Sequence, residues 1–141
     1  MGEAGDAVSS PGADAPSGRL LGMQQFEAEP GLSRVEFQAR EEFYNPGGVV
    51  QGGFLAVMLD FTMGEAARSV VEPTMTPLTV EMKISYIQPA KAGKLIGKGR
   101  VVHKGRSARR QGHSSPPGHL PGVSYRVQAG RVARKGSLYG R

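Results

Sequence analysis

A chain of 141 residues is long enough for one domain with a modest core and too short for two of ordinary size. It contains no cysteine, which excludes disulfides, a thiolate nucleophile and cysteine-based metal sites. No run approaches about 18 apolar residues, so no transmembrane helix is predicted, and the first residues lack the basic start and apolar core of a secretory signal. We therefore expect a cytoplasmic protein.

The net charge of +6 conceals two parts of opposite sign. All 12 acidic residues lie at or before Glu81, whereas 14 of the 18 Lys and Arg residues follow it. Residues 1–81 therefore carry −8 and residues 82–141 carry +14. A strongly basic segment is typical of tails that contact phosphates, so non-specific nucleic-acid contact is one hypothesis for this part.

The first elements follow from composition and period. Residues 1–25 are rich in Gly, Ala, Ser and Pro and show no hydrophobic period, which predicts a disordered leader. From Leu32 onward the pattern changes. Val35, Phe37 and Ala39 alternate with polar and charged residues, the period of a half-buried strand. Residues 41–48 end in Asn-Pro-Gly-Gly and predict a loop.

Residues 52–71 predict a helix that is apolar on nearly every side in its first half, so this half should be buried. Glu72 and Pro73 mark its end, because the residue before a proline disfavours helical dihedrals. Asp60 is an acid inside this apolar stretch. A carboxylate in such a place is costly unless it is paired or used chemically.

Beyond the helix, alternation predicts one strand over Thr79–Ile87 and another over Leu95–Val102. Residues 104–106 read as a hairpin turn. After Ser107 the pattern is lost, except for a weak alternation over residues 123–127. We therefore expect residues 108–141 to form a basic tail that is mostly disordered or aberrant.

Three motifs in order resemble one family. The stretch Asn45–Gly53 followed by Met58–Asp60 resembles the signature of PaaI-type acyl-CoA thioesterases, members of the hotdog-fold superfamily. Thr79–Lys91 is similar to that family's next strand and turn, and Gly93–Ser107 continues the match. The resemblance covers about residues 32–107. It implies an α+β hotdog fold over residues 26–107, in which an antiparallel sheet wraps around one central helix.

Two departures from the family stand out. Many members carry His at the position of Gln51, which keeps a hydrogen-bonding side chain but no titratable ring. The family also continues after the hairpin with two long strands, and here an acid-free segment stands in their place, so the hotdog fold is expected to be incomplete at its C-terminal strands. We favour an altered reading frame or wrong exon end as the explanation over a functional basic tail.

The resemblance also assigns roles for thioester hydrolysis. The backbone N–H of Gly52 would polarise the thioester carbonyl as an oxyanion hole, and Asp60 would be the general base or nucleophile. Asn45 would orient the water or the thioester, and Thr79 would hold that water. Structural alternatives stay open: the glycines could form a packing turn, and Asp60 could be capped by the hydroxyl of Thr62 or Thr79.

Substrate contacts are expected from Gln51 and Gly53 beside the candidate oxyanion hole. Lys91 and Arg106 lie near turns from which they could reach the phosphates of coenzyme A. No cofactor and no metal site is predicted, since the histidines have no carboxylate near them in sequence.

The spacing of Gly52 and Asp60 implies a second subunit. Eight residues along a helix span about 12 Å, which an aspartate side chain cannot bridge. The acid would come from a second copy across a two-fold axis, so we expect a homodimer or homotetramer.

Other functions remain open at this point. A hotdog hydratase or dehydratase usually needs a His as well as an acid, and residues 41–81 contain no His. An inactive hotdog remnant with a basic tail is a further alternative. Nucleic-acid contact has weak support, because the tail from Arg106 onward has only two aromatics, Tyr125 and Tyr139. The leading hypothesis is an acyl-CoA thioesterase acting on a small aryl or medium-chain acyl group.

Overall fold

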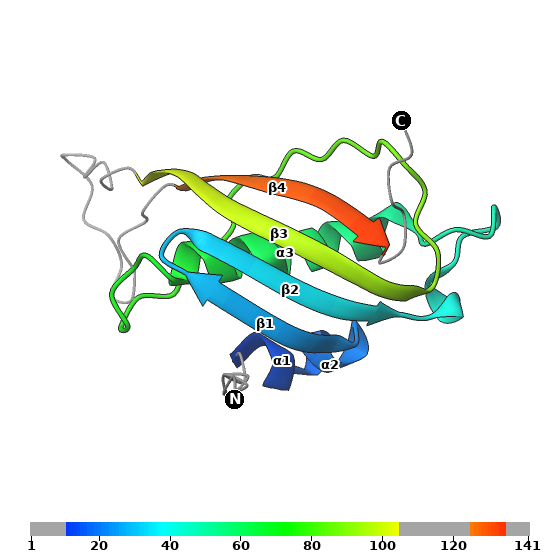
Figure 1. Ribbon diagram of the computed structural model, residues 1–141, viewed down its shortest axis with the longest axis horizontal. Coiled ribbons are helices and arrows are strands. Elements are labelled where there is room, and N and C mark those ends of the chain that lie inside the picture. Colours follow the sequence, from blue (N-terminus) through cyan, green and yellow to red (C-terminus); the bar gives the residue numbers. More distant parts are fainter. Residues whose placement is uncertain (1–10, 105–124, 135–141) are drawn as a thin grey trace, which may run out of the picture.

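The computed structural model describes residues 11–104 and 125–134. Within them, four strands form one antiparallel sheet in the order β1-β2-β3-β4, and helix α3 lies on one face of it (Figure 1). Two short helices lie beside the β1 edge, and one 3-10 turn precedes α3. The elements are α1 Pro11–Asp14, α2 Pro16–Leu20, β1 Met23–Glu29, β2 Leu32–Ala39, η1 Glu41–Phe43, α3 Gly52–Arg68, β3 Gly93–Lys104 and β4 Tyr125–Arg134.

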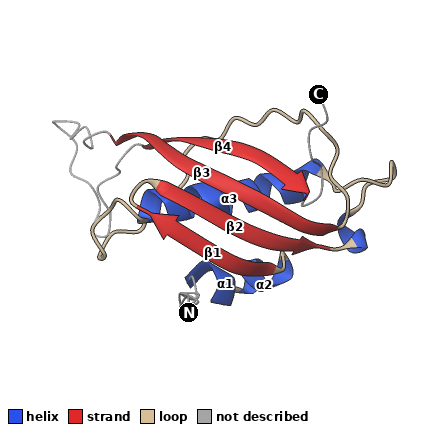
Figure 2. Ribbon diagram, in the orientation of Figure 1, coloured by secondary structure: helices blue, strands red, loops and turns tan. Residues whose placement is uncertain are grey.

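The expected α+β class, with an antiparallel sheet and a central helix, is confirmed (Figure 2). On β2, side chains two residues apart are buried toward α3, as the alternation predicted: Val35 is 0% exposed and Phe37 1%. Met58, at 1%, comes from the helix and belongs to the same apolar cluster. The sheet and α3 thus share one core.

Close packing of α3 on the sheet depends on glycine in β3. A Cβ atom on Gly97 would lie 2.2 Å from Thr62 Oγ1, and one on Gly99 would lie 2.6 Å from Ser33 Oγ. The Ser33 hydroxyl donates to the Thr62 carbonyl at 2.6 Å, which joins β2 directly to the helix backbone. These contacts place the middle of α3 at a fixed height above β3.

The end of α3 comes earlier than its apolar pattern predicted. The helix ends at Arg68, and Ser69 is its C-cap. The Ser69 hydroxyl donates to the Ala66 carbonyl at 2.7 Å and accepts the Gly31 N–H at 2.8 Å. These hydrogen bonds tie the last turn to the β1–β2 hairpin.

The expected disordered leader is wrong for residues 11–25, which form α1, α2 and the start of β1. The strand also crosses the domain boundary expected at residue 26. A register shift between Met23 and Gln25 explains why no period of two was visible. It lets Met23 and Phe26, three residues apart, both reach the core. Residues 1–10 lie outside the described residues.

The strand predicted over Thr79–Ile87 is not formed. Residues 75–92 run as an extended segment outside β4 (Figure 1) and pair with none of the named strands. Several of its apolar side chains are exposed, with Val80 at 99% and Ile87 at 80%. The alternation of apolar and polar residues in this segment predicted a strand. A strand also needs a hydrogen-bonded neighbouring strand. No described strand is hydrogen-bonded to it.

The strand predicted over Leu95–Val102 is observed as β3, extended at both ends. Part of the tail expected to lack structure forms β4, which pairs with β3 from Leu95 opposite Arg134 to Lys104 opposite Tyr125. The disorder expected for residues 108–141 is therefore wrong for β4. The rest of that tail, and the hairpin turn expected at residues 104–106 beyond Lys104, lie outside the described residues.

Candidate active site at the start of the central helix

The loop before α3 is closed by Asn45. Its backbone N–H donates to the Val49 carbonyl at 2.8 Å, and its carbonyl accepts the Gly48 N–H at 2.9 Å. Its side-chain oxygen accepts the N–H of Gly47 at 2.9 Å and that of Val49 at 3.4 Å. In this chain Asn45 therefore folds the glycine turn, and its side-chain oxygen is occupied by the backbone.

The first turn of α3 presents free N–H groups. Gln51 is the N-cap and makes no side-chain cap hydrogen bond; its carbonyl accepts the N–H of Phe54 at 3.0 Å and of Leu55 at 3.4 Å. The N–H groups of Gly52 and Gly53 have no acceptor among the described residues, as expected at a helix start. A Cβ on Gly53 would meet nothing within 4 Å, so this end is open to a ligand.

Two aromatic contacts hold this helix start in place. The ring of Phe54 stacks on that of Phe43 with centroids 4.2 Å apart, and the Gln51 N–H donates to the Phe43 carbonyl at 2.7 Å. On the other side, Tyr86 Oη donates to the Gly52 carbonyl at 3.0 Å. Tyr86 was not among the predicted site residues. Its aromatic position in the Thr79–Ile87 pattern gave no sign of this contact, which joins residues 34 positions apart.

Asp60 lies on α3, more than two turns beyond Gly52, and its side chain is half-buried. The Thr79 hydroxyl donates to Asp60 Oδ1 at 2.5 Å. Of the two hydroxyls considered as caps, Thr79 is the one that reaches the carboxylate, because Thr62 donates to the Met58 carbonyl instead. Within the described residues, Asp60 Oδ2 has no hydrogen-bond partner.

The structure therefore brings together two pairs of residues on α3. One pair lies at the start of the helix and the other about two turns further along. Gly52 meets Tyr86, and Asp60 meets Thr79. Since α3 is continuous from Gly52 to Arg68, its rise separates Gly52 from Asp60 by about 12 Å. One chain does not bring the N–H donor and the carboxylate to the same atom.

Two of the remaining predicted substrate-binding residues, Gln51 and Lys91, lie near the start of α3. Gln51 is exposed beside the free N–H groups. The Lys91 ammonium donates to the Gly48 carbonyl and lies 5.5 Å from the centroid of the Tyr44 ring, so it covers the glycine loop. Arg106 lies outside the described residues.

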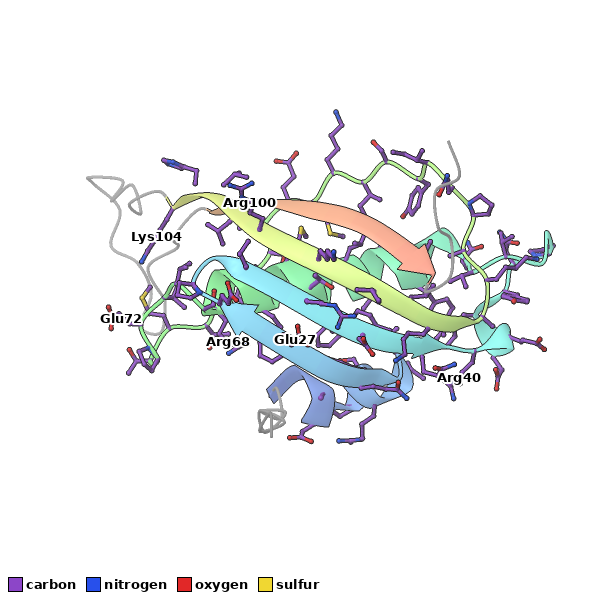
Figure 3. All side chains as sticks on the ribbon, in the orientation of Figure 1. Glu27, Arg40, Arg68, Glu72, Arg100 and Lys104 are labelled. Atoms are coloured by element: carbon purple, nitrogen blue, oxygen red, sulfur yellow. The ribbon has the colours of Figure 1, made fainter. Side chains whose placement is uncertain are left out.

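The candidate site lies at the end of the molecule where α3 begins, and a different set of charged residues lies at the end where α3 finishes. Figure 3 shows Arg40 at the end where α3 begins, and Arg68, Glu72 and Lys104 at the opposite end. At that opposite end the Lys104 ammonium donates to the Val70 carbonyl at 2.6 Å. No helix in the described part of the chain is long and apolar enough to cross a membrane.

Comparison with known proteins decides the family. Residues 47–108, which hold the helix start, Asp60 and Thr79, match the model of the thioesterase superfamily. A solved structure from Ralstonia eutropha JMP134, described as a phenylacetic acid degradation-related protein for which thioesterase activity is proposed, is 31% identical. The alignment covers 66% of this chain and 73% of that one, with a TM-score of 0.61. This chain belongs to the thioesterase superfamily.

Two further solved structures are similar to this chain. Zebrafish thioesterase superfamily member 2 is 28% identical with a TM-score of 0.58, covering 68% of this chain and 71% of that one. The PaaI protein of the E. coli phenylacetic acid degradation operon, at 20% identity and a TM-score of 0.60 over 67% of each chain, shows the shared fold. The resemblance to PaaI-type proteins noted in the sequence is confirmed.

A curated relative in Saccharolobus solfataricus, for which esterase activity is proposed, is 34% identical over 87 residues, 62% of this chain. The match spans 61% of that relative's length, and a second from the same organism is matched over 57% of its length. The chain thus spans about three fifths of these relatives, whose names indicate hydrolase activity.

Proposed function

We propose that this chain is an acyl-CoA thioesterase of the cytoplasm that hydrolyses a small aryl or medium-chain acyl-CoA to the free acid and coenzyme A. The observation that carries the proposal is the hydrogen bond from Thr79 to Asp60 of α3, a helix whose first two glycine N–H groups have no acceptor among the described residues. Membership of the thioesterase superfamily supports the same reaction class.

The start of α3 would serve as the oxyanion hole. The thioester carbonyl oxygen would accept the N–H of Gly52, where the helix dipole favours developing negative charge. The open space beside Gly53, where a Cβ atom would meet nothing within 4 Å, leaves room for a carbonyl carbon and its substituents to approach the backbone. Gln51 and Gly53 would contact the acyl-thioester portion, and Asn45 would keep the loop closed beneath it.

Asp60 would act on water, or attack directly as a nucleophile. As a general base its carboxylate takes one proton from the water that adds to the carbonyl carbon. The tetrahedral intermediate then breaks its C–S bond, and the proton passes from Asp60 to the departing thiolate. Thr79 holds Oδ1 at 2.5 Å, which orients the carboxylate and leaves Oδ2 for the proton.

A complete site would need two copies of the chain. The separation of about 12 Å along α3 keeps the Asp60 of one chain away from a carbonyl bound at its own Gly52. A two-fold axis would bring the Asp60 of a second copy to that carbonyl and generate two equivalent sites. A homodimer, or a homotetramer built from two dimers, would satisfy this requirement.

The phosphates of coenzyme A would be bound by Lys91 beside the glycine loop. The Lys91 ammonium has three N–H donors and donates one to the Gly48 carbonyl, so two donors are left to bind a phosphate. Arg106, the second candidate from the sequence, lies outside the described residues.

The proposal is tested by the release of coenzyme A from a panel of acyl-CoA thioesters, measured with a thiol reagent. Asp60→Asn keeps the shape of the side chain but loses the base, so turnover should fall at least about 100-fold with unchanged circular dichroism. Glu72→Gln is the matched control, since it removes an exposed acid at the opposite end of α3 (Figure 3). Turnover that survives in Asp60→Asn would remove Asp60 from the mechanism.

A hotdog hydratase or dehydratase remains the second enzyme candidate, and the same assay separates it. Hydration of an unsaturated acyl-CoA changes its ultraviolet absorbance and releases no thiol. The absence of His from residues 41–81 favours hydrolysis.

A further inference from the structure

We propose that Tyr86 is a positioning residue for the oxyanion hole, acting through the peptide group that joins Gly52 to Gly53. This inference rests on the proposed function, since it assigns Tyr86 a part in the same site. It adds a residue from the segment between α3 and β3 to a site otherwise built on the helix start.

The contact of Tyr86 with Gly52 is made by both its hydroxyl and its ring. The hydroxyl donates to the Gly52 carbonyl at 3.0 Å. A Cβ atom on Gly52 would lie 3.2 Å from Tyr86 Cζ and 3.3 Å from Cε1, so the ring lies directly against the glycine. Glycine at position 52 thus makes room for this ring.

The chemistry of the peptide group links this contact to the oxyanion hole. The Gly52 carbonyl and the Gly53 N–H belong to one planar unit, so a donor on the oxygen fixes the direction of the N–H. Hydrogen bonding to the carbonyl also polarises the unit and strengthens the N–H as a donor. Two successive glycines are otherwise the most mobile backbone available. Tyr86 therefore supplies the rigidity that the pair of glycines lacks.

The segment that carries Tyr86 is also tied to the carboxylate. Thr79, seven residues earlier, donates to Asp60 Oδ1 at 2.5 Å. The segment 79–86 thus contacts the two candidate catalytic groups of one helix, at Asp60 and at Gly52, although it pairs with no described strand. Loss of the Tyr86 hydroxyl should loosen the Gly52 end while leaving the Asp60 end in place.

The test compares Tyr86→Phe with Ser69→Ala in the full-length chain. Tyr86→Phe keeps the ring against Gly52 and removes only the donor. Ser69→Ala is the matched control, because the Ser69 hydroxyl also donates to a carbonyl of α3, at its other end. Steady-state hydrolysis gives kcat and KM separately, and amide NMR spectra report on the Gly53 N–H without any need for activity.

For Tyr86→Phe we expect kcat to fall about 10-fold or more with KM nearly unchanged, below the about 100- to 1,000-fold loss expected for removing an oxyanion donor itself. The Gly53 amide resonance should shift, whereas Ser69→Ala should change neither kcat nor that resonance. An unshifted Gly53 amide, or an unchanged kcat, overturns the proposal. A wild-type chain without thioester turnover overturns the proposed function instead, and the Gly53 amide then still decides whether Tyr86 holds this peptide.

Discussion

At the scale of single residues, the carboxylate of Asp60 and the carboxylate of Glu36 show two ways in which this chain uses an acid. Asp60 is half-buried, and among the described residues it has one hydroxyl partner and one oxygen without a partner, as the proposed base would need. Glu36 is 5% exposed and is held by two cations, with Arg34 at 2.6 Å and Lys94 at 2.8 Å. The first arrangement suits chemistry and the second suits stability.

The ion pairs of Glu36 with Arg34 and Lys94 should make the free energy of unfolding depend on pH. Hydrogen bonds from Lys94 and then Arg34 lower the pKa of Glu36 below its ordinary value of 4.5, against the opposing effect of burial. A lowered pKa means that ionised Glu36 stabilises the fold above that value. This contribution is lost as the pH falls through the lowered pKa of the folded state.

Glu36→Gln should therefore reduce the free energy of unfolding by about 1–3 kcal/mol at pH 7. The difference from wild type should shrink below pH 4.5, as protonated Glu36 comes to resemble the amide. Urea titrations at a series of pH values measure both. Glu27→Gln is the control, since the Glu27 side chain is 69% exposed and 3.9 Å from Arg34. A difference that stays constant down to pH 3 would contradict this assignment.

At the scale of elements, the close contact between α3 and β3 should make the fold sensitive to any side chain at Gly97. A methyl group on Gly97 would lie 2.2 Å from Thr62 Oγ1, and Thr62 is fully buried and hydrogen-bonded to Met58. Gly97→Ala should cost about 1–3 kcal/mol of stability through overpacking. Gly64→Ala is the matched control on the helix, where a Cβ meets nothing within 4 Å and should stabilise by about 0.5–1 kcal/mol. Thermal unfolding of both variants checks the opposite signs; equal effects would show that α3 does not approach β3 this closely.

Much of the arrangement of elements could be predicted from the sequence where period and partner agree. Alternation at Val35 and Phe37 predicted β2, and the apolar run after Gly52 predicted α3, both of which share the core. β1 escaped prediction because its bulge breaks the period. The segment 79–87 shows the reverse error, since its alternation is clear yet no described strand pairs with it. The local sequence pattern indicates which face of a segment is apolar, but whether the segment pairs with another strand depends on the rest of the chain.

The candidate site was predictable to the same extent. Asn45, Gly52, Asp60 and Thr79 follow from the family motifs, and the structure adds that Thr79 reaches Asp60 and that Asn45 closes the turn. Their roles in catalysis stay predictions. Tyr86 could not be predicted, because its contact with Gly52 depends on how the segment after α3 returns along the helix.

At the scale of the whole molecule, the proposed active site depends on assembly of the chain. A single chain holds the Gly52 N–H and the Asp60 carboxylate about 12 Å apart, so the site we propose requires at least two copies. Light scattering on a size-exclusion column should give a discrete dimer or tetramer. A monomer would mean that Gly52 and Asp60 of different chains do not meet, and the chain would be an inactive remnant of its family.

Subunit mixing tests the shared site most directly. Asp60→Asn lacks the base, and Gly52→Pro lacks the N–H donor at the first helical position, where proline is favoured. Because a Cβ at position 52 would lie 3.2 Å from the Tyr86 ring, circular dichroism and light scattering first check that the Gly52→Pro variant folds and assembles. Each variant alone should be inactive. When they are co-expressed in equal amounts, half of the dimers contain both chains, and each of these has one site with an intact Gly52 and an intact Asp60. Acyl-CoA hydrolysis should return to about a quarter of the wild-type rate. No recovery from stable mixed dimers would contradict the shared site.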